Sequence, residues 1–324
     1  LEQGVKGGRW FSLIDKVYSE RVLRSSFARV KRNRGAAGVD HVTTERFGAS
    51  LDKELKRLSE ELRSGSYRPQ AIRREWIPKP GSRERRPLGI PTVRDRVVQT
   101  SLRLVLEPIY EREFAEHSYG FRPGRGCHAA IAQVEELLKQ GYSWVVDVDL
   151  RSFFDTLDHE VLMGQVRHKV ADSRVLTLLE ALLSQEVMDG LQSWLPEEGT
   201  PQGAVISPLL SNIYLDPLDH RMADDGYMMV RYADDFVLLC RTEQEAHEAL
   251  RTVQDWTAQV GLSLHPDKTR LVDATQRGGF DFLGYHFERG YKWPRTKSLK
   301  KLKDAVRPKT KRTSGHSLEK VISD

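Results

Sequence analysis

Two apolar segments that each carry a pair of aspartates constrain the fold of this chain more than any other feature. The segment "SWVVDVDL" (143–150) is rich in apolar β-branched residues and predicts a buried strand that bears Asp147 and Asp149. Residues two apart on a strand point to the same face of a sheet. The segment "YMMVRYADDFVLLC" (227–240) predicts two strands and a tight turn with Asp234 and Asp235 beside it. If these strands are neighbours in one sheet, three carboxylates can converge.

Such a group of carboxylates has two readings. Burying several negative charges without compensation is costly, and divalent cations relieve that cost. Oxygen ligands without His or Cys suit Mg²⁺, and two such ions about 3.5–4 Å apart form a clamp for in-line phosphoryl transfer. The plainer reading is a turn, because Asp favours turns and adjacent aspartates at a hairpin are common. From these residues alone, a metal site and a turn remain about equally open.

The order of the elements predicts an α+β fold. From residue 143 onward we expect a strand, helices, a hairpin at "VMDGLQSW", a helix, a strand pair, a helix and further strands at 269–274 and 280–287. This order favours a mostly antiparallel sheet with helices on one face. Asp158 and Ser207 are candidate helix caps, and Thr242 has the capping-box spacing to Glu245. No glycine-rich nucleotide motif argues for a doubly wound fold.

The first part of the chain is more helical. Apolar spacing predicts one helix over 43–64, with Gly65 placed to end it. Residues 66–96 predict short strands around the loop "PKPGSRERRP". The remaining expected elements are a helix over 97–114 bent near Pro108, a loop over 119–126 and a helix over 127–140.

The charge distribution points to a polyanionic partner. The net charge is only +5, yet residues 68–96 carry nine Lys or Arg against three acids, and residues 292–312 carry ten against one. Each basic stretch is interrupted by Pro or Gly and an aromatic residue. Two such stretches on an otherwise acidic chain favour a nucleic acid over a merely solvated basic surface.

Cysteine content and hydropathy indicate the cellular compartment of the protein. The two cysteines, Cys127 and Cys240, have no zinc-ligand spacing, which predicts a reducing compartment and no zinc site. No apolar run has the length of a membrane span, and the first residues lack a signal-like segment. We therefore expect a cytoplasmic protein with no membrane association.

Several sequence blocks, taken together, identify a family. "RYADDF", "VVDVDLRSFFDTLDH", "EGTPQGAVISPLLSNIYLDPLD", "RPLGIPTVRDRVVQ", "SYGFRPGRGCHAAI" and "FDFLGYHF" resemble the bacterial group II intron-encoded reverse transcriptases (maturases), in that family's order over roughly residues 25–320. The resemblance implies a right-hand polymerase with helical/β fingers, a ferredoxin-like antiparallel palm and a truncated helical thumb. It divides the chain into an N-terminal extension and start of the fingers, fingers, palm, and basic linker with partial thumb, over 1–66, 67–141, 142–290 and 291–324.

The resemblance also assigns residues. Asp149, Asp234 and Asp235 match the family's catalytic, metal-binding aspartates, and Asp147 is a neighbour on the same face. For the incoming nucleotide, the matching residues are Phe154 under the sugar, Gln202 and Gly203 in the pocket, and Lys79 and Arg86 on the triphosphate, although Arg85 and Arg86 are hard to tell apart. Arg122 and Arg125 are candidate contacts to the template backbone, with surface arginines as the alternative. Residues 298–307 resemble the first thumb helix, with Leu299, Leu302 and Val306 on one face.

The implied function is an RNA-directed DNA polymerase. It uses two Mg²⁺ ions, for which Mn²⁺ can substitute, and its partners are an RNA template such as intron RNA, a DNA primer and dNTPs. The alternatives are an intron RNA-binding maturase that acts mainly in splicing, a domesticated reverse transcriptase of antiphage defence or CRISPR spacer acquisition, and, more remotely, a nucleotide cyclase. The absence of a Cys/His cluster of the HNH type predicts no endonuclease activity.

Overall fold

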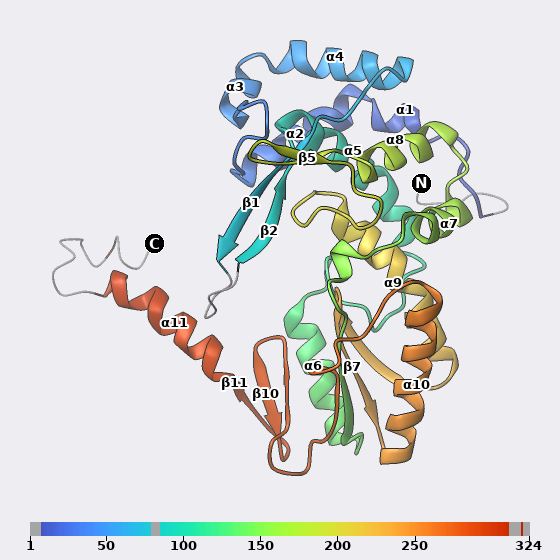
Figure 1. Ribbon diagram of the computed structural model, residues 1–324, viewed down its shortest axis with the longest axis vertical. Coiled ribbons are helices and arrows are strands. Elements are labelled where there is room, and N and C mark those ends of the chain that lie inside the picture. Colours follow the sequence, from blue (N-terminus) through green and yellow to red (C-terminus); the bar gives the residue numbers. More distant parts are fainter. Residues whose placement is uncertain (1–7, 79–84, 311–318, 320–324) are drawn as a thin grey trace.

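The computed structural model describes residues 8–78, 85–310 and 319, and Figure 1 shows the arrangement of their elements. Helices dominate the upper part of the molecule in that view, and a four-stranded sheet with its helices forms the lower part. The helices are α1 (Ile14–Val17), α2 (Glu20–Arg32), α3 (Thr44–Ala49), α4 (Leu51–Ser64), α5 (Val93–Tyr110), α6 (Cys127–Lys139), α7 (His159–Lys169), α8 (Ser173–Leu183), α9 (Ser207–Asp224), α10 (Glu243–Gln259) and α11 (Thr296–Lys309).

The lower sheet has the topology expected of the palm. Its strands are β3 (Trp144–Asp149), β6 (Met228–Tyr232), β7 (Asp235–Cys240) and β8 (Arg270–Asp273), in the order β6-β7-β3-β8. Every neighbouring pair is antiparallel. Numbered along the chain, the four strands lie in the order 2-3-1-4, which is the ferredoxin-like arrangement. The predicted antiparallel palm is confirmed.

Helices cover both faces of this sheet, whereas the sequence analysis expected them on one face. Val146 and Val148 of β3 pack in the same core as Ala249 of α10, while Val145 packs with Val134 of α6 on the opposite face. Strands that are buried on both faces lose the apolar–polar alternation of half-exposed strands. The unbroken apolar run "FVLLC" (236–240) carried this signal. Asp147 and Asp149 share the face of Val145, so they point to the side of α6.

A second four-stranded sheet belongs to the upper part. It contains β1 (Ile72–Pro78), β2 (Arg85–Ile90), β4 (Val187–Asp189) and β5 (Gln192–Trp194), in the order β2-β1-β4-β5. The predicted strands around the "PKPGSRERRP" loop and the predicted hairpin at "VMDGLQSW" are both present. The hairpin joins this second sheet, however, through a parallel pair between β1 and β4. A segment within the expected palm range thus extends the sheet of the expected fingers range, which is called the fingers sheet below.

Several helix boundaries differ from the prediction. The expected helix over 43–64 is divided at Ser50 into α3 and α4, while Gly65 ends α4 in the left-handed conformation (φ 77°) as expected. Helix α5 spans 93–110 rather than 97–114, because the Thr92 side chain accepts a hydrogen bond from the Asp95 amide and begins the helix earlier. Ser207 is the first residue of α9 and does not cap it, because its hydroxyl bonds the Pro201 carbonyl instead.

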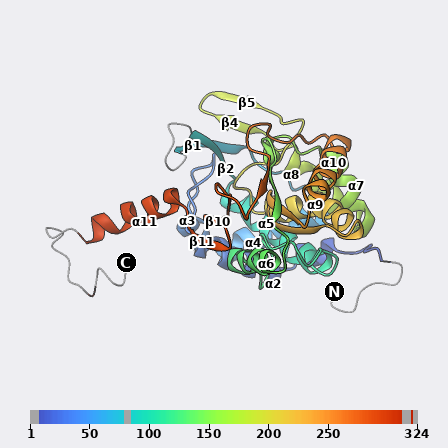
Figure 2. The same cartoon turned by 90° about the horizontal axis from the view of Figure 1, so that it is seen from below.

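The C-terminal region forms small strands and one projecting helix. The expected strand over 280–287 is two strands, β9 (Phe280–Phe282) and β10 (Tyr285–Glu288), because Leu283 and Gly284 between them have positive φ values of 46° and 86°. β11 (Tyr291–Pro294) completes a three-stranded sheet. The predicted thumb helix is present as α11, which projects away from the body (Figures 1 and 2). Its Leu299, Leu302 and Val306 are exposed.

Within the residues that the structure describes, no helix has both the length and the apolar character of a membrane span.

Candidate active site

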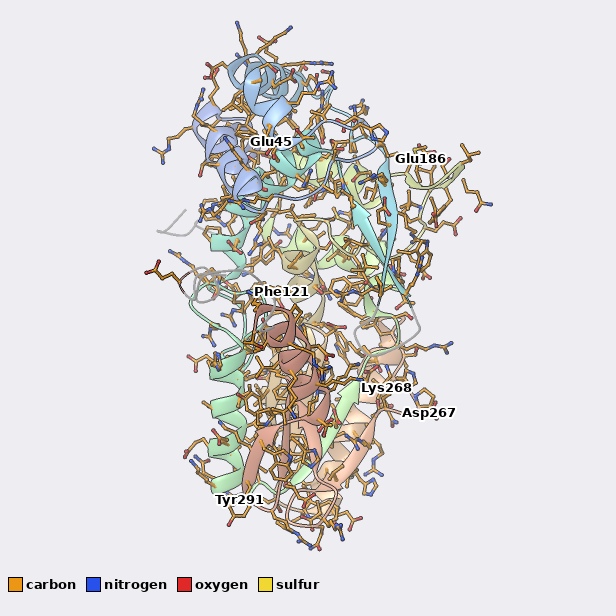
Figure 3. All side chains as sticks on the ribbon, turned by 90° about the vertical axis from the view of Figure 1, so that its left-hand side faces the viewer. Glu45, Phe121, Glu186, Asp267, Lys268 and Tyr291 are labelled. Carbon is orange, nitrogen blue, oxygen red and sulfur yellow. The ribbon has the colours of Figure 1, made fainter. Side chains whose placement is uncertain are left out.

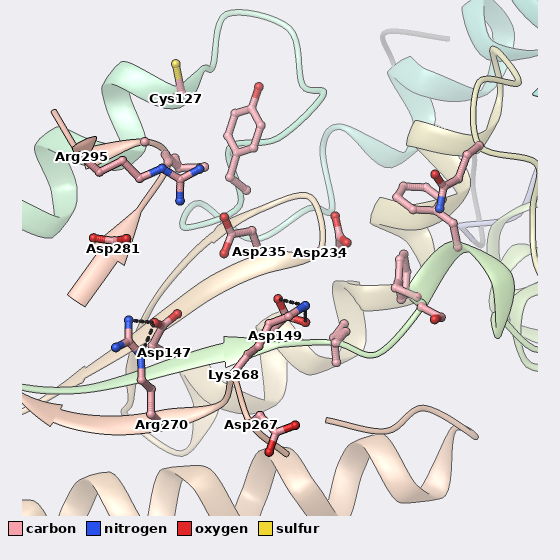
Figure 4. Close-up of a pocket in the computed structure, with 18 residues that line it drawn as sticks. Cys127, Asp147, Asp149, Asp234, Asp235, Asp267, Lys268, Arg270, Asp281 and Arg295 are labelled. Carbon is pink, nitrogen blue, oxygen red and sulfur yellow. Dashed lines mark hydrogen bonds and ion pairs between the residues drawn. The ribbon is translucent and has the colours of Figure 1, made fainter. Parts of the chain in front are cut away.

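The aspartates of the two strand segments meet at one cavity. Asp147, Asp149, Asp234 and Asp235 all line a cavity of about 910 Å³ at the end of the palm sheet (Figure 4). The register explains this arrangement, because Asp149 on β3 lies directly opposite Asp235 on β7. Opposite residues of an antiparallel pair point to the same face. The predicted convergence of carboxylates is therefore present at one end of the sheet.

The turn that carries Asp234 is held from below by a buried arginine. Ala233 occupies the left-handed region (φ 61°), which few residues with a side chain adopt. The fully buried Arg231 guanidinium donates to the Ala233 carbonyl at 2.9 Å and forms an ion pair with Asp219 of α9. It also donates to the Asn212 side-chain oxygen at 3.0 Å. This network was not predicted from the sequence, although an arginine between apolar strand residues is a signal of a buried ion pair.

A glycine on a neighbouring loop fits against the same turn. A Cβ on Gly120 would lie 2.2 Å from the Ala233 amide nitrogen, a distance that no side chain tolerates. The Gly120 carbonyl accepts a hydrogen bond from Asn212 at 2.8 Å. The loop 119–126 therefore presses its backbone onto the turn, and only glycine permits this approach.

Burial raises the pKa of Asp147, Asp234 and Asp235, and neighbouring carboxylates add to the effect. Burial raises the pKa of Asp147, and Arg270 opposes that effect. Burial and then the charge of Asp149 raise the pKa of Asp234. The pKa of Asp235 is raised to about 7, first by the loss of hydration in the cavity wall and then by the charges of Asp147, Asp234 and Asp149. The Asp235 residue is nevertheless exposed to solvent. A bound cation would reverse the part of the pKa rise that comes from the neighbouring negative charges.

Two cations of β8 and the loop before it lie on the carboxylates. The Lys268 ammonium is 3.2 Å from both carboxylate oxygens of Asp149, and the Arg270 guanidinium is 3.1 Å from Asp147. Figure 3 places Lys268 where the lower sheet meets the upper part. Arg270 is the register partner of Asp147 on the neighbouring strand. Neither residue was predicted from the sequence, because only the pairing of β8 with β3 brings them to the cavity.

The donor set suits a hard divalent cation. All four acidic side chains present oxygen atoms, and Mg²⁺ characteristically takes one or two carboxylates, waters and substrate phosphates. Among the described residues no group of three or more His, Cys, Asp or Glu side chains is arranged to hold a metal ion by itself.

Two of the predicted nucleotide-binding residues line the same cavity. Phe154 and Gln202 both contribute to its wall. Phe154 lies on a short 3₁₀-helix (Phe153–Asp155) that follows β3. Phe153 is buried with its ring centre 5.3 Å from that of Phe154, which remains half-buried.

The other predicted nucleotide contacts are placed differently. Gly203 has φ 107°, and a Cβ there would lie 2.7 Å from the Gly89 carbonyl oxygen, so its backbone approaches β2 and not the cavity. Arg86 is exposed on β2, opposite Ile77. Lys79 lies outside the described residues.

The two candidate template arginines differ from each other. The Arg122 side chain is 2% exposed and is paired with Glu111 at 2.8 Å, and it also donates to the Ser118 carbonyl at 2.9 Å. A buried guanidinium that is engaged in this way holds the loop and is not available to a template, so that prediction for Arg122 is not supported. Arg125 is half-buried and lies 5.8 Å from the Tyr119 ring centre.

Comparisons with known proteins agree with this geometry. A family model described as reverse transcriptase (RNA-dependent DNA polymerase) matches residues 77–287. The chain is 36% identical over 291 residues to Protein YkfC of Escherichia coli (strain K12), covering 78% of this chain and 76% of YkfC. It is 38% identical over 189 residues to the group II intron-encoded protein LtrA of Lactococcus lactis subsp. cremoris.

The last of these matches covers 58% of this chain and 31% of LtrA, so the chain spans about a third of that relative. Among solved structures, a telomerase from Candida albicans in complex with a fragment of telomeric RNA superposes with a TM-score of 0.55 at 13% identity. It covers 76% of this chain and 51% of the telomerase, and it shows a shared fold alone. With the family model covering most of the chain, this protein belongs to the reverse transcriptase (RNA-dependent DNA polymerase) family, among relatives of the group II intron type.

Proposed function

We propose that this chain is the polymerase part of a group II intron-type reverse transcriptase, which extends a DNA primer with dNTPs on an RNA template. One observation carries the proposal: Asp149 and Asp235 face each other across β3 and β7, with Asp234 beside them on the turn, in the wall of a cavity of about 910 Å³ that Phe154 and Gln202 also line. A turn alone gives no reason for this convergence.

The proposed roles follow from the positions in the cavity. Asp149, Asp234 and Asp235 would hold the divalent ions that polymerases of this family use, and two Mg²⁺ or Mn²⁺ ions supply activation of the primer 3′-hydroxyl and stabilisation of the leaving pyrophosphate. Phe154 would pack under the sugar of the incoming nucleotide, and Gln202 would line the nucleotide pocket. Aligning the hydroxyl with the α-phosphate then lowers the barrier without a covalent intermediate.

The substrate partners are assigned by chemistry. Arg86, which is exposed on β2, would contact the triphosphate, and Arg125 would contact the template backbone. Lys79, which lies outside the described residues, stays a triphosphate contact on the sequence resemblance alone. We retain the division into N-terminal extension and start of the fingers (1–66), fingers (67–141), palm (142–290) and basic linker with partial thumb (291–324). Two segments pack against a domain other than their own in this division. Helix α6, in the fingers range, packs on the palm sheet, and β4–β5, in the palm range, extends the fingers sheet. The proposed setting is the bacterial cytoplasm.

Primer extension tests the proposal. A DNA primer annealed to an RNA template is incubated with dNTPs and Mg²⁺, beside the same reaction with Asp234→Asn/Asp235→Asn. Asp267→Asn is a matched control, because Asp267 is a carboxylate that lines the same cavity outside the β3–β7 pair. We expect extension by the unaltered chain and the control, and loss of at least about 100-fold in the double variant. Undiminished extension by the double variant would show that the assignment is wrong.

A second candidate function is the binding of intron RNA as a maturase. The observation that favours it is α11, which carries exposed Leu299 and Leu302 together with a basic surface and projects from the body. Splicing of an intron RNA by the Asp234→Asn/Asp235→Asn variant would separate the two functions, because RNA binding needs no carboxylate set.

A further inference from the structure

Two tryptophans and an arginine form an exposed platform on the fingers sheet. Ile72 on β1 is the register partner of Val187 on β4, and Val187 is the partner of Trp194 on β5. Arg74 and Trp76 follow Ile72 at intervals of two, so they share its face. The platform defined by Arg74, Trp76 and Trp194 therefore lies on one side of the sheet.

The three side chains contact one another but leave aromatic surface open. The Arg74 guanidinium lies 4.6 Å from the ring centre of Trp194 and 5.6 Å from that of Trp76. Trp76 is 43% exposed and Trp194 is 37% exposed. The Trp76 indole donates to Asp189 at 2.9 Å, which holds the ring on the sheet. Large aromatic rings rarely stay in water unless they contact a partner.

The platform is connected to the wall of the candidate active site. Gly89 is the register partner of Arg74, and its amide donates to the Gln202 carbonyl at 2.6 Å. Gln202 lines the cavity that contains the aspartates. Burial raises the pKa of Asp155, the residue after Phe154, and the charge of Arg74 opposes that rise. The β4–β5 hairpin forms an edge of the molecule, while α11 projects from another side (Figure 2).

We propose that Trp76, Trp194 and Arg74 bind the single-stranded RNA template ahead of the polymerisation site, with bases stacked on the two indoles and a phosphate near the guanidinium. Stacking on aromatic rings with a nearby cation is the mode by which proteins hold single strands without reading their sequence. The cation beside the two rings favours a strand that carries phosphates over an uncharged partner surface. This inference rests on the proposed polymerase function, because that function supplies an unpaired template strand beside the fingers.

Binding measurements with two substrates test the platform. Each is a labelled DNA primer on an RNA template without dNTPs, one with a single unpaired template nucleotide and one with eight. We expect the unaltered chain to bind the long overhang more tightly. Trp76→Ala/Trp194→Ala should bind the long overhang about 10- to 100-fold more weakly and the short overhang unchanged. Trp76→Phe/Trp194→Phe should restore most of the loss, which shows that the effect is stacking and not misfolding.

Leu191→Ser is the matched control, since Leu191 is a fully exposed apolar residue on the same hairpin, and it should change neither affinity. If Trp76→Ala/Trp194→Ala binds both substrates equally more weakly, or binds the long overhang as tightly as the unaltered chain, the platform does not bind the template overhang. Addition of one nucleotide on the short overhang reads the polymerase function separately. If the unaltered chain binds with the expected overhang dependence but adds no nucleotide, the proposed function fails while the platform stands.

Discussion

Arg231 and Asp219 form an ion pair in which neither side chain has any exposed surface. The pair joins β6 to α9, and the same guanidinium bonds the carbonyl of Ala233 on the turn before Asp234. A buried charge without its partner is far more costly than a surface charge. The geometry of the candidate active site thus depends on a charge pair that lies beneath it.

Replacing Arg231 by Met should destabilise the protein by about 3–5 kcal/mol, because Asp219 is left buried and uncompensated. Urea denaturation measures the loss. Arg221→Met is the control, since its ion pair with Asp225 is on the surface and should contribute less than about 1 kcal/mol. Similar losses in the two variants would contradict the prediction.

Asp216 should weaken the fold at neutral pH. Burial and then the charge of Asp219 raise the pKa of Asp216 to about 6. A carboxyl group whose pKa is raised by folding destabilises the native state once pH exceeds its unfolded value, and the cost levels off above pH 6. Asp216→Asn should therefore stabilise the protein by about 1 to 3 kcal/mol at pH 7.5 and by nothing near pH 3.5. Denaturation at both pH values checks this, and an equal gain at both would refute it.

Lys268 should compete with a divalent cation for Asp149. The ion pair is partly exposed, so its removal changes affinity by no more than about 5-fold. We expect Lys268→Met to reach half of its Mg²⁺-induced rise in melting temperature at about 2- to 5-fold lower MgCl₂ than the unaltered chain. Lys292→Met, which loses a pair with Glu135 away from the cavity, should leave the midpoint unchanged. An unchanged or higher midpoint for Lys268→Met would exclude the competition.

Gly120→Ala should displace the turn that carries Asp234. The added Cβ would meet the Ala233 amide at 2.2 Å, and relieving such overlap costs about 1–3 kcal/mol. Thermal denaturation should show the loss, together with weaker primer extension. Gly164→Ala on α7 is the control, because nothing lies within 4 Å of its new Cβ and alanine favours the helix. Full stability and activity of Gly120→Ala would show that the loop can move.

Phe154→Val should relax discrimination against ribonucleotides. A smaller side chain leaves room for a 2′-hydroxyl, and steric discrimination of this size is worth about 10- to 200-fold. The ratio of kcat/KM for a dNTP and the matching rNTP measures it, and the dNTP reaction of the same variant is the internal control. An unchanged ratio would place the sugar away from Phe154.

Much of the site was predictable because it depends on local rules. Alternation in "SWVVDVDL" put Asp147 and Asp149 on one face, and the turn at Ala233 followed from two apolar runs around adjacent aspartates. Gly65 and Thr242 act as the helix signals indicated. These features involve residues within a few positions of each other, where backbone preferences decide the structure.

Long-range contacts decided the rest. No local pattern pairs β8 with β3, and that pairing brings Arg270 onto Asp147. Likewise, burial and not sequence spacing separates Arg122, which is enclosed and paired with Glu111, from Arg125, which is half-buried and donates to the Glu116 carbonyl. By itself the sequence determined the strands, the turn and the carboxylates that they carry. Only the tertiary structure decided which charges meet them, because electrostatic partners are chosen by packing between segments far apart in the chain.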